Sequence, residues 1–579
     1  MQPRHHRTVE WVVRRPDAAV VQRLTRSLKI PPLLALLLHN RDLADLSEAR
    51  HFLAASLDHL HSAEELPGME RAAQRLADAV QGGERLAVYG DYDVDGTSGT
   101  ALLVRFFREL GAPVTYHIPS RFEAGYGLNL DDVERLINDG ARVLITVDCG
   151  TTNYAEVDHA QGRGVDVIVV DHHHTPNQPL RVTALVNPKL AGCSYPWPHL
   201  ASVGLCFKLA HAVRRLLHQR GVSKLPNLKR SLDLVALGTI ADLVPLRGEN
   251  HTLVRHGLEE LTQTKKVGVQ ALKEVSFLSG ETINTGHVGF RLAPRLNAAG
   301  RMEDARLAVE LMLTEDRRRA AELAGQLDAL NRSRQETQEQ IVEEALVLAE
   351  QQLAATGGPG LVVASQGWHI GIVGIVAARL AETFHQPTLV IAVEGAECRG
   401  SGRSVQGVDL YRALKECDDL FTKFGGHTHA VGFSMPAGYL DGLQRRFRKA
   451  VLAQVGEQPP GPKLVIDAEV ELAALDFAFV SSLDRMAPFG IDNPAPVFCA
   501  RGVTVLGEPR LMGREKQHVR LQVKQNATVS AAVGFNLASS LRGFDWRGRR
   551  ADIVFRPNLN TWNGTTQVQL QLQDLRPAE

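Results

Sequence analysis

Short apolar runs rich in β-branched residues recur after residue 85, and most are followed by a helical pattern. The runs cover residues 86–89, 114–118, 143–147, 167–170 and 185–186. The apolar residues of four segments have the spacing of amphipathic helices: residues 97–110, 130–138, 153–161 and 203–219. Strands that alternate with helices predict a mostly parallel, doubly wound α/β sheet. A further helix over residues 231–240 would place Asp242 just beyond its end.

The pattern changes several times along the chain and so divides it into five regions. Residues 314–354 are rich in Ala, Leu, Glu, Gln and Arg without Pro, which predicts a long connecting helix. A Pro- and Gly-containing stretch, residues 458–462, indicates a linker. We predict an N-terminal helical region (1–80), a first α/β domain (81–313), the connecting helix (314–355), a second α/β domain (356–457) and a small β-barrel (463–579).

The expected elements of the last two regions are short. In the second α/β domain we expect strands over residues 361–364 and 388–392 and a helix over 370–383. After the linker, strand-like runs cover residues 463–466, 497–506, 519–523, 529–533 and 567–572. Such a series is compatible with a five-stranded OB barrel.

Composition narrows the class of protein. The 579 residues carry 65 Lys and Arg and 65 Asp and Glu, so the net charge is zero and any path for nucleic acid must be a local groove. The six Cys residues include no C-x-x-C pair, which argues against a disulfide framework or a zinc site. No apolar run approaches the length of a transmembrane helix, and residues 1–7 are polar. We therefore expect a cytoplasmic protein.

Acidic residues follow three of the expected strands. Asp91, Asp93 and Asp95 follow the first strand, Asp148 follows another, and Asp171 with three histidines follows a third. The carboxyl ends of parallel strands form the edge where open α/β sheets bind ligands. Asp and His without nearby Cys form the ligand set of a hydrolytic Mn²⁺ or Mg²⁺ site, with an imidazole nitrogen from His172 and a further carboxylate from Asp242. Two such ions can activate a bridging water, and Asp148 could bridge them.

Other interpretations of these motifs stay open at this point. The three aspartates converge if the strand continues, whereas only two converge if the chain turns at Gly96. A calcium loop of the EF-hand type needs a Glu at its twelfth position, where this chain has Leu102. His172, His173 and His174 could also form a polar surface turn.

Several segments, taken together, resemble one known superfamily. Residues 90–96, 147–150 and 171–173 resemble successive motifs of the DHH phosphoesterases. Residues 291–301 and 368–377 resemble the bacterial single-strand-specific 5′ exonucleases of that superfamily, and residues 424–432 resemble the signature of its DHHA1 domain. Residues 486–490, followed by Asn493-Pro494, resemble the start of the OB domain found in those exonucleases. The resemblance runs in the expected order from about residue 50 to the end of the chain.

The resemblance implies a two-metal exonuclease that digests single-stranded DNA from the 5′ end to mononucleotides in DNA repair and recombination. It implies a DHH domain and a DHHA1 domain joined by the long helix, followed by the OB barrel. The implied metal ligands are Asp93, Asp95, Asp148, His172 and Asp242. His173 is expected to contact the scissile phosphate or to support the ligands. Smaller members of the superfamily begin the first motif with a His, where this chain has Tyr89. Either Asp91 or water would take the place of that ligand, so Asp91 either binds a metal ion directly or lies behind the ligands.

The same resemblance implies contacts with DNA. Arg121, Ser401 and Arg403 are expected to hold the terminal 5′-phosphate, although residues 399–404 alone would also suit a tight solvated turn. Tyr126 could stack on a base or pack within its loop. For three further residues a DNA contact and a structural role are both open: Asn297 (a buried turn amide), Arg301 (an ion pair with Glu303 or Asp304) and His427 (a support for the Gly-Gly turn).

Two further expectations concern DNA binding by the barrel and the proteins that cooperate with this one. Basic residues at Arg514, Lys516 and Arg520 suit single-strand binding on an OB surface, with a plain solvated face as the alternative. The resemblance also implies a monomer that cooperates with a single-strand-binding protein and a helicase. Two rival functions remain: another DHH enzyme acting on oligoribonucleotides, cyclic dinucleotides or pyrophosphate, and a non-catalytic DNA-binding scaffold.

Overall fold

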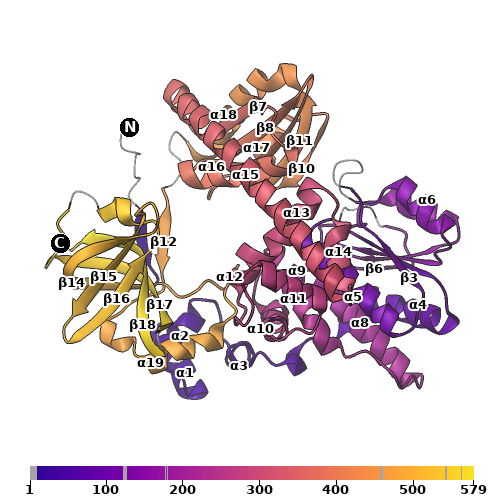
Figure 1. Ribbon diagram of the computed structural model, residues 1–579, viewed down its shortest axis with the longest axis horizontal. Coiled ribbons are helices and arrows are strands. Elements are labelled where there is room, and N and C mark those ends of the chain that lie inside the picture. The colour runs from indigo at the N-terminus through magenta and orange to yellow at the C-terminus, as the bar shows by residue number, and fades with distance from the viewer. Residues whose placement is uncertain are drawn as a thin grey trace. The chain divides into compact units, whose positions relative to one another are not determined.

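The computed structural model describes residues 9–120, 127–175, 178, 180–456, 461–541, 544–562 and 564–578 (Figure 1). The chain divides into two compact units. The larger unit comprises Trp11–Pro294, Arg306–Ala324 and Leu464–Glu579, and the smaller unit comprises Met1–Glu10, Arg295–Ala305 and Gly325–Lys463. Among the helices of the described residues, none is both long enough and apolar enough to cross a bilayer.

The first domain of the larger unit is built on a five-stranded parallel sheet in the order β3-β2-β4-β5-β6. The strands are β2 (Leu86–Gly90), β3 (Val114–His117), β4 (Val143–Val147), β5 (Asp166–Val170) and β6 (Ala184–Val186). Every residue of β2 and β4 is buried, as expected for parallel strands covered on both faces. The strand order reverses between β2 and β4, so that the carboxyl ends of these two strands flank the topological switch point. The predicted doubly wound sheet is confirmed.

Helices cover both faces of this sheet. Apolar residues of α6 (Leu130–Asn138) and α7 (Tyr154–Gly162) share one core with Ala87, Leu144 and Val167. On the opposite face α5 (Val94–Glu109) and α8 (Ser202–Gln219) contact the central strands. The other helices of this domain are α4 (Met69–Gly82), α9 (Leu232–Ala241), α10 (Gly248–Thr262), α11 (Val267–Val275), α12 (Thr285–His287) and α14 (Arg306–Leu313).

The predicted OB barrel is also confirmed, and it closes on itself. Its strands are β14 (Phe498–Met512), β15 (His518–Gln525), β16 (Thr528–Gly534), β17 (Arg550–Trp562) and β18 (Thr565–Pro577). They follow the order β14-β15-β16-β18-β17, and β14 pairs with β17 to complete the ring. The short strand β13 (Ala468–Glu469) adds to β14, and β1 (Glu10–Val13) pairs with β12 (Lys463–Ile466).

The N-terminal helices pack on this barrel. Leu34, Phe52 and Phe479 share one hydrophobic core with Phe498 and Phe555 of the barrel strands. The N-terminal helices that contribute are α1 (Ala18–Leu28), α2 (Pro32–His39) and α3 (Leu46–Ala54). Phe479 comes from α19 (Phe477–Ser482), which precedes β14. The two ends of the chain are therefore held together by a single core of apolar residues, as Figure 1 also shows for α1, α2 and the barrel.

The smaller unit contains a mixed sheet in the order β10-β11-β9-β8-β7. Its strands are β7 (Leu361–Gln366), β8 (Thr388–Glu394), β9 (Glu397–Arg403), β10 (Lys423–His427) and β11 (Ala430–Pro436). Its helices are α13 (Ala293–Met302), α16 (Ile370–Phe384), α17 (Leu410–Lys415) and α18 (Leu440–Val455). The predicted long helix is α15 (Arg317–Thr356), which contributes its first turns to the larger unit and the rest to the smaller unit.

Candidate metal centre

Backbone hydrogen bonds fix a row of acids along the carboxyl edge of the parallel sheet. The amide of Asp91 donates to Val147 O (3.0 Å). The amides of Asp148 and Asp171 donate to the last residues of the neighbouring strands, at 3.0 and 3.1 Å respectively. Each acid therefore stands one residue beyond its strand and is anchored to the adjacent strand.

Side chains from this edge gather in three overlapping groups that could each hold a metal ion. The groups are Asp91–Asp93–Asp148, Asp95–His172–Asp242 and Asp148–His172–His173, and the ligand atoms within each lie within 4.8 Å of one another. Asp148 and His172 each belong to two groups. All seven residues predicted for this site from the sequence therefore lie close together.

The three aspartates after β2 do not alternate along an extended strand as one interpretation had expected. Helix α5 begins at Val94, three residues before the predicted start, because Asp93 caps it by accepting hydrogen bonds from the amides of Asp95 (2.9 Å) and Gly96 (3.1 Å). A Cβ at Gly96 would lie 2.5 Å from Asp91 O, so glycine permits this tight turn. The turn sends Asp91 and Asp93 into one group and Asp95 into the other.

Asp95 is held by the first turn of α8. Its two carboxylate oxygens accept from the amides of Ser202 (2.7 Å) and Val203 (2.8 Å). These amides belong to a helix N-terminus, where the backbone favours negative charge. Gly238 of α9 allows the close packing, since a Cβ there would lie 2.4 Å from Ser98 Oγ and 3.0 Å from Asp95 Oδ1. Burial, followed by the charge of Asp93, raises the pKa of Asp95 to about 7.

Asp148 is the central carboxylate. It is buried and has a φ of +65°, a left-handed conformation that is uncommon for residues other than glycine and that concentrates at functional sites. Ser202 Oγ donates to Asp148 Oδ1 (2.8 Å). The Nε2 atom of His172 lies 3.4 Å from that same oxygen and 3.5 Å from Asp242 Oδ2. One imidazole thus faces a carboxylate of each group.

Asp171 organises the histidine turn. Its Oδ1 accepts from the amides of His172 (2.8 Å) and His173 (3.1 Å) and lies 2.7 Å from His173 Nδ1. Its Oδ2 accepts from the hydroxyl (2.6 Å) and the amide (3.3 Å) of Thr151. Burial alone would raise the pKa of Asp171, but the hydrogen bond and charge of His173 and the hydrogen bond of Thr151 outweigh it and hold the pKa below its usual range. Asp171 therefore fixes both the backbone and one ring.

The donor set fits divalent cations. Burial, followed by the charges of the neighbouring aspartates, raises the pKa of Asp148 and of Asp242 well above the usual carboxyl value. Burial lowers the pKa of His172 to about 3, which keeps this imidazole neutral, as metal ligation requires. Asp242 Oδ2 and His172 Nδ1 are buried and make no hydrogen bond with the described residues. A cation between these carboxylates would relieve their repulsion.

A second cluster of predicted residues forms within the smaller unit, at the N-terminus of α16. Arg301 Nη1 donates to Gly371 O (3.1 Å), and Arg403 Nη1 donates to Ser401 Oγ (3.1 Å). A Cβ at Gly374 would lie 3.0 Å from Ser401 Oγ and 3.2 Å from Arg403 Nη2. Two guanidinium groups and a hydroxyl therefore surround the first turn of a 15-residue helix, which is a favourable setting for a phosphate. We call these five residues the α16 cluster.

The positions of the other predicted DNA-contacting residues do not decide between a DNA contact and a structural role. Residues 399–403 lie in strand β9 rather than in the tight turn that was the alternative. Asn297 is half-buried in α13, and His427 is exposed on β10. Arg121 and Tyr126 lie outside the described residues.

Sequence reasoning missed several residues that support the metal centre. Ser202 reaches both Asp95 and Asp148 from a distant helix, and no motif around it indicates this role. Lys189, which follows β6, is near enough for its charge to act on Asp242, Asp171 and Asp148 while burial lowers its pKa. Asn187 Nδ2 donates to His173 O (2.9 Å). None of these three residues belongs to a motif quoted from the sequence, whereas Asp171 does.

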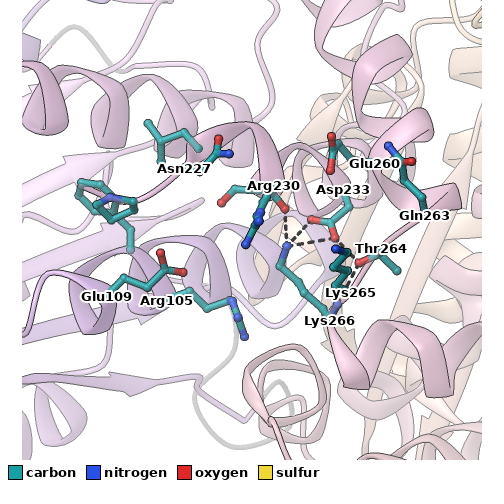
Figure 2. Close-up of a pocket in the computed structure, with 14 residues that line it drawn as sticks. Arg105, Glu109, Asn227, Arg230, Asp233, Glu260, Gln263, Thr264, Lys265 and Lys266 are labelled. Carbon is teal, nitrogen blue, oxygen red and sulfur yellow. Dashed lines mark hydrogen bonds and ion pairs between the residues drawn. The ribbon is translucent and has the colours of Figure 1, made fainter. Parts of the chain in front are cut away.

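The helices that carry the metal centre also border a separate cavity at their other ends. This cavity has a volume of about 550 Å³ and lies between the end of α5, the start of α9 and the loop after α10 (Figure 2). Lys266 Nζ bridges both carboxylate oxygens of Asp233 there, at 2.9 and 3.1 Å. None of the predicted site residues lines it.

The fold and the site together define a DHH-type phosphoesterase with an appended OB barrel. Family models for the DHH family N-terminal domain, the DHHA1 domain and the RecJ OB domain match residues 85–239, 357–456 and 466–574, respectively. The single-stranded-DNA-specific exonuclease RecJ of Bacillus subtilis is 36% identical over 99% of this chain and 71% of its own length. That of Escherichia coli is 34% identical over 95% of this chain and 96% of its own. The chain belongs to the RecJ family.

Solved structures agree with this placement. RecJ from Thermus thermophilus in complex with Mn²⁺ superimposes with a TM-score of 0.84 at 29% identity, covering 99% of this chain and 80% of that one. The same protein in complex with Mg²⁺ gives a TM-score of 0.78. That relative therefore binds either ion.

Proposed function

We propose that this chain is a metal-dependent exonuclease that digests single-stranded DNA from its 5′ end to mononucleotides, in DNA repair and recombination. The observation that carries the proposal is the pair of Asp and His groups linked through Asp148 and His172 at the β2–β4 switch point. Membership of the RecJ family supplies the substrate class.

The residues divide naturally between two ions. Asp91, Asp93 and Asp148 would hold one, and Asp95, His172 and Asp242 would hold the other. Asp148, whose Oδ1 lies 3.4 Å from His172 Nε2, would bridge the two ions. Bound divalent ions would lower the pKa of a water molecule and neutralise charge on the phosphate. Oxygen ligands with one imidazole accept either Mn²⁺ or Mg²⁺, and the nitrogen favours Mn²⁺.

The surrounding side chains keep this ligand set in place. Ser202 restrains Asp148 through its hydroxyl and Asp95 through its amide. Asp171 lies 2.7 Å from Nδ1 of His173 and so fixes the orientation of this half-exposed ring, which we propose contacts a phosphate oxygen of the substrate. The carboxylates then need not move when DNA binds.

We propose that the α16 cluster holds the terminal 5′-phosphate; the contact expected of Arg121, which lies outside the described residues, stays a prediction from the sequence. The helix N-terminus and the two arginines supply donors without reading any base, which suits an enzyme that is indifferent to sequence. Tyr126, Asn297 and His427 remain proposed contacts along the strand. A cytoplasmic monomer that cooperates with a helicase and a single-strand-binding protein fits this substrate.

An end-labelled digestion tests the proposal. The substrates are single-stranded DNA, duplex DNA and RNA, each with Mn²⁺, Mg²⁺ or EDTA, and with Asp148→Ala as the inactive control. We expect mononucleotides released from the 5′ end of single-stranded DNA in either metal and none in EDTA. Release from the 3′ end, or equal digestion of the duplex, would argue against it.

A further inference from the structure

A large apolar side chain stands exposed beside the metal centre. Leu243 directly follows the candidate ligand Asp242, and 68% of its surface is accessible. Its φ is +59°, in the left-handed region. Its amide donates to Ile240 O (3.3 Å), which ends helix α9 with this conformation.

Neither property is explained by folding stability. A left-handed conformation is strained for a residue with a Cβ, and glycine or asparagine would adopt it more easily. An exposed leucine gains little from packing, because most of its apolar surface stays in water. The chain therefore keeps a strained, exposed leucine at a position where a less costly residue would support the same turn.

The position of Leu243 suggests what the side chain contacts. Adjacent Cα atoms lie 3.8 Å apart, and Asp242 Oδ2 lies 3.5 Å from His172 Nε2. Leu243, exposed and one residue from a candidate ligand, therefore belongs to the rim of the metal centre. A phosphate bound at the metals would bring its own nucleotide to that rim, and the base is the nucleotide's largest flat apolar surface.

We propose that Leu243 packs against the nucleobase next to the scissile phosphate and positions that nucleotide for cleavage. This inference rests on the proposed function, because it names a contact for the same substrate. The contact is apolar and reads no base edge, so it tolerates every sequence.

The test compares Leu243→Gly and Leu243→Asn, both of which suit a left-handed turn, with a matched control. Phe277→Gly is that control, because Phe277 is also exposed (81%) and also has a positive φ (+55°), on a turn that supplies no ligand to the metal groups. For each variant we would measure kcat/KM on single-stranded DNA, the Mn²⁺ dependence and Tm. A strand whose 5′-terminal nucleotide lacks its base completes the set.

We expect both Leu243 variants to keep or raise Tm, to keep the Mn²⁺ dependence and to lose about 5–10-fold in kcat/KM, the effect of losing part of one buried apolar side chain. The abasic strand should lower the wild-type rate to a similar extent and should cause no further loss in the variants. Phe277→Gly should match the wild type.

Three results would overturn the inference: unchanged kcat/KM in the Leu243 variants, a loss explained by weaker Mn²⁺ binding, or an abasic effect that adds fully to the substitution. The proposed function fails separately, if the wild-type protein does not digest single-stranded DNA.

Discussion

Asp171→Asn is the substitution that tests most sharply how the histidine turn supports the metal centre. The carboxylate accepts three hydrogen bonds on Oδ1 from the histidine turn and two on Oδ2 from Thr151. An asparagine keeps the volume but replaces one of these oxygens with an NH₂ group. In either orientation of the asparagine amide, its NH₂ group faces N–H or O–H groups that donate to the carboxylate in the wild type. His173 also loses its charged partner.

The expected loss follows from that geometry. Partners that orient metal ligands without touching the metal are typically worth about 10–100-fold in metal affinity or activity. We expect the Mn²⁺ concentration for half-maximal digestion of single-stranded DNA to rise by about that factor. Because hydrogen bonds to a charged group contribute about 1.5–3 kcal/mol each, we also expect a free energy of unfolding lower by about 2–3 kcal/mol.

The assay is a Mn²⁺ titration of the digestion rate, with Asp166→Asn as the matched control. Asp166 starts the same strand, at the edge opposite Asp171, where it forms an ion pair with Arg75 (2.6 Å). Its loss should affect stability only, because it lies about 16 Å from Asp171 along an extended strand. An unchanged Mn²⁺ titration in Asp171→Asn would refute the reasoning, as would an equal shift in the control.

Three further predictions concern other parts of the molecule. Arg403→Ala should slow digestion of 5′-phosphorylated strands more than of unphosphorylated strands, and a rate comparison that shows equal losses would count against the α16 cluster. Gly374→Ala should keep or raise Tm, since alanine is favoured over glycine in helices by about 1 kcal/mol, while its Cβ displaces Ser401 and Arg403 and weakens the same 5′-phosphate preference. His251 is buried against Phe52, and burial lowers its pKa to about 4, so the unfolded chain, with a pKa of about 6.5, takes up a proton first as the pH falls. The unfolding free energy should therefore fall by up to about 3 kcal/mol between pH 6.5 and 4, and His251→Phe, followed by denaturant titration, should flatten that part of the profile relative to the wild type.

The parallel sheet could be predicted from local patterns because its strands are short apolar runs, and three of them, β2, β4 and β5, are followed directly by an acid. Strand β9, Glu397–Arg403, could not be predicted in this way, because its residues are polar or glycine. Its glycines are required by neighbours far along the chain: a Cβ at Gly400 would lie 2.2 Å from Phe433, and one at Gly402 would lie 2.5 Å from Leu389. Strand β17 was missed as well.

In the candidate site, too, some features could be predicted from local sequence patterns and others could not. The acids were predictable because the carboxyl edge of a parallel sheet brings strand ends together. The start of α5 at Val94 depends on Asp93 acting as a cap, a choice that the alternating carboxylates did not reveal. Ser202 lies 54 residues from Asp148 and 107 from Asp95, so only the fold could show their contacts.

Direct location of the ions tests the central claim. A crystal of the chain grown with Mn²⁺, measured at the manganese absorption edge, would show each bound ion as an anomalous peak. We predict two peaks at the β2–β4 edge, both in contact with Asp148, and their loss in Asp148→Ala. The absence of peaks at that edge in the wild-type crystal, or peaks that persist in Asp148→Ala, would contradict the two-metal centre.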